Sequence, residues 1–142
     1  MISEPNCIFC KIVAGMIPCQ KVLETDRALV FLDISPVNLG HVLIVPRSHH
    51  AHLGELDEAD AAHIGALLPK ICRAVLSATG ASAINVVINN GRDAGQTVDH
   101  GHWHVIPRFP ADAVHWPWPH VAYPPEGPGP LRERIRSALA SE

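Results

Sequence analysis

The chain has 142 residues, a net charge of −3 and 47% hydrophobic residues, which suits one domain with its own core. A negative net charge does not favour binding to nucleic acid, so we expect no nucleic-acid partner. No uncharged apolar run approaches the ~20 residues needed to span a bilayer. The first residues lack a basic region followed by an apolar core, so we expect no signal peptide, no membrane partner and a cytoplasmic location. Thiols stay reduced there, so the four cysteines are not expected to form disulfides.

The segments before position 81 predict two helices and three strands. A short helix is expected from Cys7 to Gly15, and a long one from an N-cap at Asp57 to a stop at Gly80. Pro69 inside the long helix predicts a kink rather than a break. The three strands are expected at residues 22–23, 28–33 and 41–46.

Two more strands are predicted after position 80, at residues 83–89 and within 99–109. Short connections between neighbouring strands favour antiparallel pairing, so the element order predicts an α+β fold with a five-stranded antiparallel sheet. Residues 1–109 are expected to form the domain core. Residues 110–142 are expected to be a proline-rich extension, irregular until a short helix at 131–140, that docks on the same domain or on a dimer partner.

Three histidines follow one another at a spacing of two: His100, His102 and His104. Two is the period of a β-strand, so the imidazoles are predicted to share one face, roughly 6.6 Å apart. Three imidazoles can form a catalytic zinc site, or the middle one can attack an electrophile. The preceding loop, 95–97, has a glycine that lets backbone amides approach an anion and a hydroxyl that can donate to phosphate, which favours attack on phosphorus.

The run Gly95-Gln96-Thr97-Val98, followed by the three histidines, resembles the signature of the histidine-triad (HIT) family. Segments 7–18, 31–36, 40–49 and 89–91 are similar to the family's other motifs in the same order. The resemblance covers about residues 6–109. It implies a HIT-like fold whose sheet continues across a homodimer.

The resemblance also implies nucleotidyl hydrolysis or transfer at the α-phosphate of a purine nucleotide, such as a nucleoside phosphoramidate or a dinucleoside polyphosphate. His102 resembles the nucleophile that forms a nucleotidyl-histidine intermediate, and His104 would contact the phosphate or leaving group, with His100 completing the triad. Asp33 would accept hydrogen bonds from the ribose, five apolar residues would enclose the base, and an amide and a hydroxyl would hold phosphate oxygens. The implied nucleotide-binding residues are Ile8, Phe9, Ile12, Phe31, Asp33, Ile34, His41, Asn89, Gly95, Gln96 and Thr97.

Cys7 and Cys10 form a C-x-x-C pair, which can be buried thiols, a redox pair or half of a zinc site. A redox pair needs a strand leading into a helix N-terminus, and too few residues precede Cys7 for that. Some bacterial members of the resembled family carry a Cys-Cys-His-His zinc site, which implies His49 and His100 as the other ligands. Two nearby histidines compete with His49 for this role: His50 and His52.

Two tryptophans stand between prolines in the segment His115-Trp116-Pro117-Trp118-Pro119-His120. Such side chains are costly when exposed, so they either pack within one subunit or lie at a dimer interface or over the leaving group. Two positions depart from the family pattern. Asp99 is usually apolar or aromatic, and Gly101 is usually a branched apolar residue, whose loss weakens packing on that face.

Three functions from different classes remain open. The first is a HIT-type nucleotide hydrolase that uses His102 and carries a structural zinc. The second is a nucleotide-binding regulatory protein with vestigial catalysis. The third is a metal hydrolase whose zinc is held by the three triad histidines, against which the loop 95–97 argues, because that chemistry does not need it.

Overall fold

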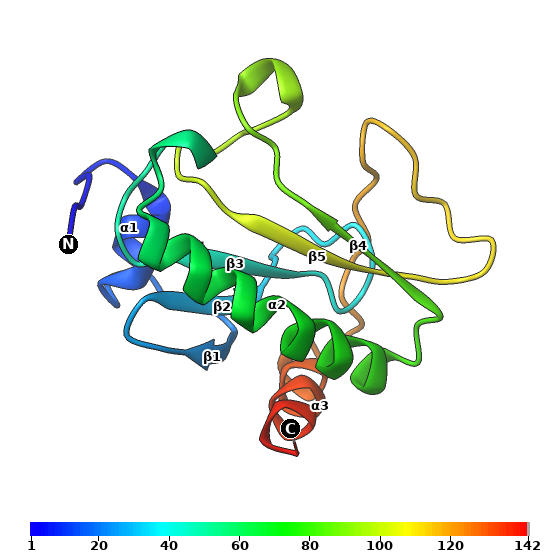
Figure 1. Cartoon of the computed structure of the whole chain (residues 1–142). Coiled ribbons are helices and arrows are strands. Elements are labelled where there is room, and N and C mark those ends of the chain that lie inside the picture. Colours follow the sequence, from blue (N-terminus) through cyan, green and yellow to red (C-terminus); the bar gives the residue numbers. More distant parts are fainter. Residues whose placement is uncertain (142) are drawn as a thin grey trace.

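The computed structural model describes residues 1–141 and contains one five-stranded sheet (Figure 1). The strand order is β1-β2-β3-β5-β4, and every neighbouring pair is antiparallel. The strands are β1 (Lys21–Glu24), β2 (Ala28–Leu32), β3 (Val42–Pro46), β4 (Ala83–Val87) and β5 (Trp103–Arg108). The predicted α+β fold with a five-stranded antiparallel sheet is confirmed.

Three α-helices and two short 3-10 turns accompany the sheet: α1 (Ile8–Val13), α2 (Glu58–Thr79), α3 (Gly129–Ala140), η1 (Leu53–Glu55) and η2 (Arg92–Ala94). The long helix begins where the Asp57 side chain accepts hydrogen bonds from the amides of Ala59 and Asp60. It ends at Gly80, whose φ of 70° is left-handed, and runs unbroken through Pro69.

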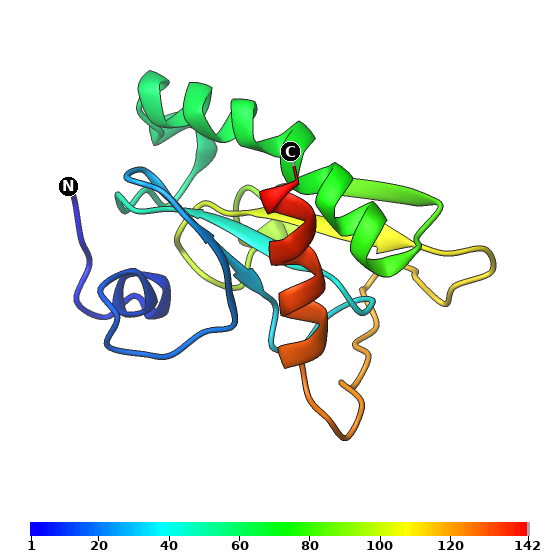
Figure 2. The ribbon, with the colours of Figure 1, turned by 90° about the horizontal axis from the view of Figure 1, so that it is seen from below.

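Both faces of the sheet centre are covered, because successive residues of a strand point to opposite sides. Ala28, Val30 and Leu32 of β2 belong to the cluster with α2 and α3. Leu29 and Phe31 belong to the cluster with α1. Figure 2 shows α2 on one side of the sheet and α1 on the other. All residues of β2 and β3 are therefore buried, whereas β4 is a partly exposed edge strand.

Among the described residues, α2 is the one helix long and apolar enough, by length and composition, to cross a membrane. It carries Lys70 and Arg73 within its span, and it lies across the sheet rather than standing apart from it (Figure 1). Ile64, Ile71 and Val75 on its inner face are almost fully buried in the main core. This is the packing of a core helix.

The C-terminal extension folds back on the same chain. α3 places Leu131, Ile135 and Leu139 in the core that α2 shares with the sheet. Residues 109–128 contain no helix or strand, as the prolines predict. This segment lies against the turn after β2, through His120 and Tyr123, and against the ring of His104, through Trp118.

Candidate active site and metal cluster

The histidine segment is not the regular strand that its spacing predicts. β5 begins at Trp103, so only His104 lies within it. Before that point the backbone turns instead of pairing: the amide of His100 donates to Val98, and the amide of Gly101 donates to the carbonyl of His50. The three imidazoles therefore do not form an evenly spaced row, and each has its own surroundings.

His102 is held by a backbone carbonyl. Its Nδ1 lies 2.6 Å from the carbonyl oxygen of His100, which can only accept, so Nδ1 carries the hydrogen. In the neutral ring the lone pair is then on Nε2. Burial lowers the pKa of His102, which keeps the ring neutral, and the edge-to-face contact with Phe9 at 4.9 Å fixes its plane. The result is an imidazole with a nucleophilic nitrogen available at neutral pH.

His104 has the opposite tautomer, set through His41. The amide of Val37 donates to Nδ1 of His41 at 3.1 Å, so the hydrogen of neutral His41 is on Nε2. That Nε2 lies 2.9 Å from Nδ1 of His104, which accepts, leaving the hydrogen of His104 on its own Nε2. Burial lowers the pKa of His104 to about 3 and that of His41 well below its usual value. The pair is neutral and presents an N–H donor.

This burial gives the free energy of unfolding a defined pH dependence. Because the pKa of His104 is about 3 in the folded state and near 6.5 when exposed, the unfolded chain holds more protons between these values. Its contribution to stability is therefore present above pH 6.5 and is lost as the pH falls towards 3. In urea titrations between pH 6 and 4, wild type should lose roughly 1 kcal/mol per pH unit more than His104→Asn. Equal slopes would contradict the assigned burial effect.

A cavity of about 360 Å³ opens beside the two imidazoles. Seven of the predicted site residues line it. They lie in the turn after β2, just before β3, in the loop after β4 and in the histidine segment. These are Asp33, His41, Asn89, Gly95, Thr97, His102 and His104. Thr97 thus lines the same cavity as His102.

The tryptophan segment closes the same cavity within this chain. The Trp118 ring lies 4.9 Å from that of His104, and Trp116 stacks edge-on against Trp118 at 5.4 Å. Trp116 also covers Gly95, where a Cβ would lie 2.6 Å from its ring, so this glycine leaves the space the indole fills. The two tryptophans therefore pack within this chain, at the edge of the cavity, and Trp116 remains 62% exposed.

The aromatic and aliphatic residues predicted to enclose a base are not all brought together. Phe9 and Phe31 are buried and pack edge-to-face at 5.9 Å, with Ile12 partly buried against them. Ile8 and Ile34 lie on separate depressions and are 45% and 86% exposed. Their exposed surfaces are available to a ligand, whereas the two phenylalanines form the floor beneath His102.

Gln96 does not reach the cavity. Its side chain is buried, and its amide nitrogen donates to the carbonyls of Ala51 and Val98 at 2.8 Å. Its Oε1 accepts from the amide of Gly91 at 2.6 Å. The predicted contact of this side chain with phosphate is thus not supported, because all its polar atoms brace the loop between β4 and the histidine segment.

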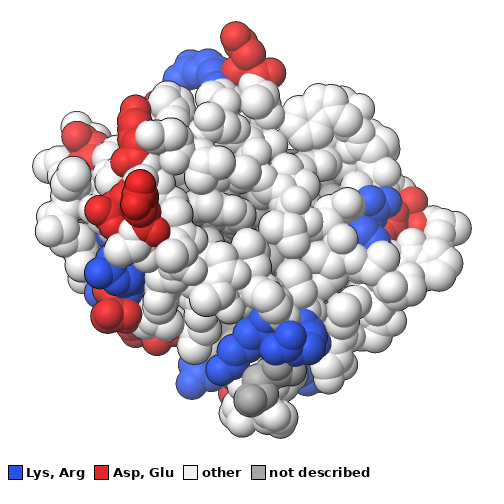
Figure 3. Space-filling view, viewed as in Figure 1, with Lys and Arg blue, Asp and Glu red and all other residues white. Residues whose placement is uncertain are grey.

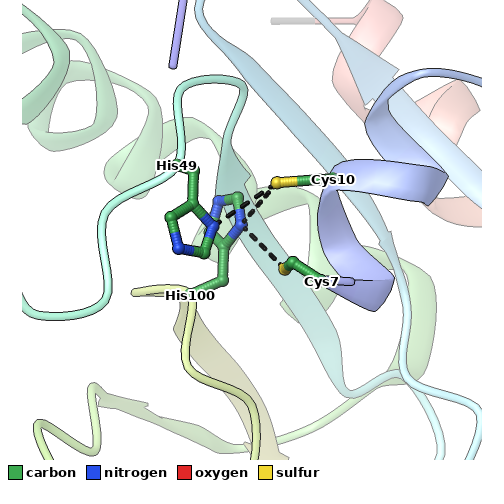
Figure 4. Close-up of side chains that lie close together, drawn as sticks. All are labelled: Cys7, Cys10, His49 and His100. Carbon is green, nitrogen blue, oxygen red and sulfur yellow. Dashed lines mark hydrogen bonds between the residues drawn. The ribbon is translucent and has the colours of Figure 1, made fainter. Parts of the chain in front are cut away.

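Cys7, Cys10, His49 and His100 form a compact cluster in which all four ligand atoms lie within 4.8 Å of one another (Figure 4). Nε2 of His100 donates to the carbonyl of Pro46 at 2.9 Å, so its Nδ1 lone pair faces the thiols, 3.4 Å from Cys7. Nδ1 of His49 lies 3.4 Å from the sulfur of Cys10. Two thiols and two imidazoles in this arrangement fit a tetrahedral zinc site, and His49 rather than its neighbours completes the set.

Two other metal arrangements do not fit. The triad histidines cannot share one ion, because Nδ1 of His100 faces the thiols while Nδ1 of His102 is bound to a carbonyl. Asp33, His41 and His104 also lie within 4.8 Å of one another. However, the Val37 amide occupies the lone pair of His41 Nδ1, so its Nε2 carries a hydrogen and is no ligand.

The fold and this pair of sites define a histidine-triad protein, and the comparisons agree. The HIT domain model matches residues 14–111. The adenosine 5'-monophosphoramidase hnt1 of Schizosaccharomyces pombe is 42% identical over 135 residues, which are 94% of this chain and 98% of the relative. The adenylylsulfatase HINT3 of Arabidopsis thaliana is 40% identical over 111 residues, which are 78% of this chain and 56% of the relative.

Among solved structures, a zinc-bound histidine triad family protein from Mycobacterium smegmatis superposes with a TM-score of 0.85. It is 34% identical, and the match covers 96% of this chain and 94% of that one. The chain belongs to the HIT family.

Proposed function

We propose that this chain is a nucleotidyl hydrolase or transferase that acts at the α-phosphate of purine nucleotides through His102. The observation that carries the proposal is the pairing of opposite tautomers in one cavity: an Nε2 lone pair on His102 beside an N–H donor on His104. The relatives support the same class of reaction, since one is named a phosphoramidase and another an adenylylsulfatase.

The tautomers assign the steps. Nε2 of His102 attacks the α-phosphorus, the bond from phosphorus to the leaving group breaks, and the leaving group takes up a proton from solvent. In the second step water attacks phosphorus, the bond from phosphorus to Nε2 breaks, and the nucleoside monophosphate leaves with release of one proton, which restores neutral His102. The carbonyl of His100 stabilises the positive charge that develops on the His102 ring. The His104 N–H donates to a phosphate oxygen or the leaving atom.

The remaining cavity residues supply binding. Oδ1 of Asp33 already accepts from the amide of Ser35 at 2.8 Å, which leaves Oδ2 for the ribose hydroxyls. Asn89, Gly95 and Thr97 line the same cavity, and we assign them to the phosphate. Gly95 has a φ of 90°, a left-handed conformation that suits glycine.

We propose that zinc occupies the cluster of Cys7, Cys10, His49 and His100 and has a structural role. When bound, the ion would tie α1 to the segments that follow β3 and precede β5. The relative from Mycobacterium smegmatis, described as zinc-bound, supports this assignment. Burial raises the pKa of the Cys7 thiol, so a free thiolate is disfavoured and the redox interpretation is the weaker one.

We also propose a homodimer in which β4 continues the sheet into its partner. β4 is an edge strand, and Val86 on it is 44% exposed. Figure 3 shows that the centre of the face carrying α2 is largely uncharged, with acidic and basic residues gathered towards its rim. An exposed edge beside an uncharged surface suits pairing with a second copy of the chain.

A substrate panel tests the proposed activity. Adenosine 5'-monophosphoramidate and a dinucleoside polyphosphate would be incubated with the protein, with and without brief chelation, and nucleoside monophosphate would be measured. We expect release of AMP that does not depend on added metal, because no ion takes part at His102. Binding without turnover would favour the regulatory protein instead, and activity that needs added metal would contradict the covalent mechanism.

A further inference from the structure

The turn that carries Asp33 is bound by the C-terminal extension, and one of the residues that bind it, His120, also lines the cavity. Three donors of the extension each meet a backbone carbonyl of the turn: the Tyr123 hydroxyl with Asp33 at 2.6 Å, Nδ1 of His120 with Ser35 at 2.7 Å, and the Val121 amide with Pro36 at 2.7 Å. Three residues of the segment 120–123 therefore bind three residues of the segment 33–36, which lies far away in sequence.

The direction of the Asp33 carboxylate depends on this turn. Its Oδ1 accepts from the amide of Ser35, two residues on, so the side chain is locked to the backbone of the turn. Its Oδ2 then lies 3.8 Å from Nε2 of His41, at the wall of the cavity. A shift of the turn would move the oxygen that is left to accept from a ribose.

Within the turn, the amide of Asp33 donates to the carbonyl of His41 at 3.0 Å and Pro36 is buried, but the two residues between them, Ile34 and Ser35, are exposed. β2 ends at Leu32, and the Ile34 side chain is 86% exposed, so it provides no anchor. Pro36 has no amide hydrogen to contribute. The extension is anchored instead, because α3 is buried in the main core and Tyr123 packs partly buried against it.

We propose that residues 120–123 are a specificity element that sets the preference for ribonucleotides over 2'-deoxyribonucleotides by fixing the Asp33 turn. The inference rests on the proposed function, in which Asp33 accepts from the ribose hydroxyls. Tyr123 is a positioning residue: its hydroxyl acts through the backbone of Asp33 and lies on the far side of the turn, in a neighbouring depression. The chemistry selected is a vicinal diol.

Tyr123→Phe tests this, because it removes one hydroxyl and keeps the ring that packs on the core. Calorimetry would give the dissociation constants of AMP and 2'-deoxy-AMP, neither of which can be turned over. We expect AMP to bind roughly fivefold more weakly to the variant, the usual effect of one hydrogen bond, and 2'-deoxy-AMP to bind as to wild type. For the ribonucleoside phosphoramidate, KM should rise while kcat stays within about twofold.

Substitutions of His120 give a second readout. Because this side chain also lines the cavity, the variant that restores the donor separates its bond to Ser35 from a direct contact with the ligand. His120→Ala should reproduce the loss for AMP, whereas His120→Asn, whose amide nitrogen can replace Nδ1 as donor, should restore it. Ser141→Ala is the matched control, since this hydroxyl of the same extension, just after α3, bonds to the carbonyl of Ser137, away from the Asp33 turn. Equal weakening for both nucleotides, or none for either, would overturn the inference. Failure of the proposed function would show separately, as a wild-type protein that does not turn over the phosphoramidate.

Discussion

Replacing His102 with alanine should lower the hydrolysis of adenosine 5'-monophosphoramidate by about a thousandfold or more, with the fold intact. The reason is chemical: the variant lacks the one lone pair that the carbonyl of His100 directs away from the backbone and towards the cavity. Because His104 is neutral and carries its hydrogen on Nε2, it presents a donor and cannot replace the nucleophile. Steady-state kinetics with thermal unfolding measured in parallel provide the test.

His63→Ala is the matched control for this experiment. His63 lies on α2, where its Nε2 meets the Thr25 hydroxyl at 2.9 Å, and it is not among the residues that line the cavity. We expect this variant to keep wild-type kcat. Appreciable turnover by His102→Ala would contradict the covalent mechanism, since general base catalysis by a neighbouring imidazole would then be sufficient.

Cys7→Ser should abolish zinc binding and lower the melting temperature. The wild-type chain is expected to hold one zinc ion, and linkage makes its contribution about 4 kcal/mol at a free zinc concentration a thousand times the dissociation constant. For a domain of this size that corresponds to roughly 10 °C in Tm. Metal analysis of the purified protein and calorimetry with and without a chelator would measure both effects.

Cys72→Ser separates loss of zinc from loss of any thiol. Cys72 lies on α2, half-buried at the edge of the main core and away from the cluster. This variant should retain zinc and respond to the chelator as wild type does. If Cys7→Ser kept its zinc and His102→Ala lost it, the ion would bind at the triad. That result would contradict the ligand set of Cys7, Cys10, His49 and His100.

The sheet and its main helix follow from local sequence patterns. Asp57 and Gly80 mark the ends of α2 because capping is a local interaction, and both ends are found where predicted. β2, β3 and β4 are slightly shorter than predicted and β1 is longer, since the ends of a strand depend on which neighbour it pairs with. The membrane-like composition of α2 is explained only by its packing on the sheet, which no periodicity reveals.

The histidine segment shows where pattern reasoning fails. A spacing of two predicts one face, but the last residue of β3 supplies a partner for the His100 ring and the loop after β3 supplies one for Gly101. These long-range bonds override the strand before Trp103. Pattern reasoning also fails for Gln96, whose side-chain amide is hydrogen-bonded to the backbone of Gly91 and of the distant Ala51. The tautomers depend on carbonyls and amides, which the sequence does not place.

The role of residues 120–123 is also absent from the sequence patterns. The prolines predict irregular structure, and the tryptophans indicate that something must cover them, but neither shows which turn the extension reaches. One signal was available: Tyr123 is the only tyrosine of the chain, and it stands among prolines where a buried hydroxyl needs a partner.

His100 links the two sites in one residue. Its ring belongs to the metal cluster, and its carbonyl holds the hydrogen of His102 Nδ1. The proposed zinc would therefore fix the backbone group that orients the nucleophile, without contact with substrate. This explains how a structural cluster and a catalytic imidazole can share a segment of three residues.

The most direct measurement of the central claim is mass spectrometry of the protein quenched, without acid, during turnover of adenosine 5'-monophosphoramidate. The account predicts a transient adenylyl group on one peptide, mapped to His102, which is absent from His102→Ala and decays as AMP appears. Rapid turnover with no adenylylated protein at any quench time, or an adenylyl group mapped to another residue, would contradict it.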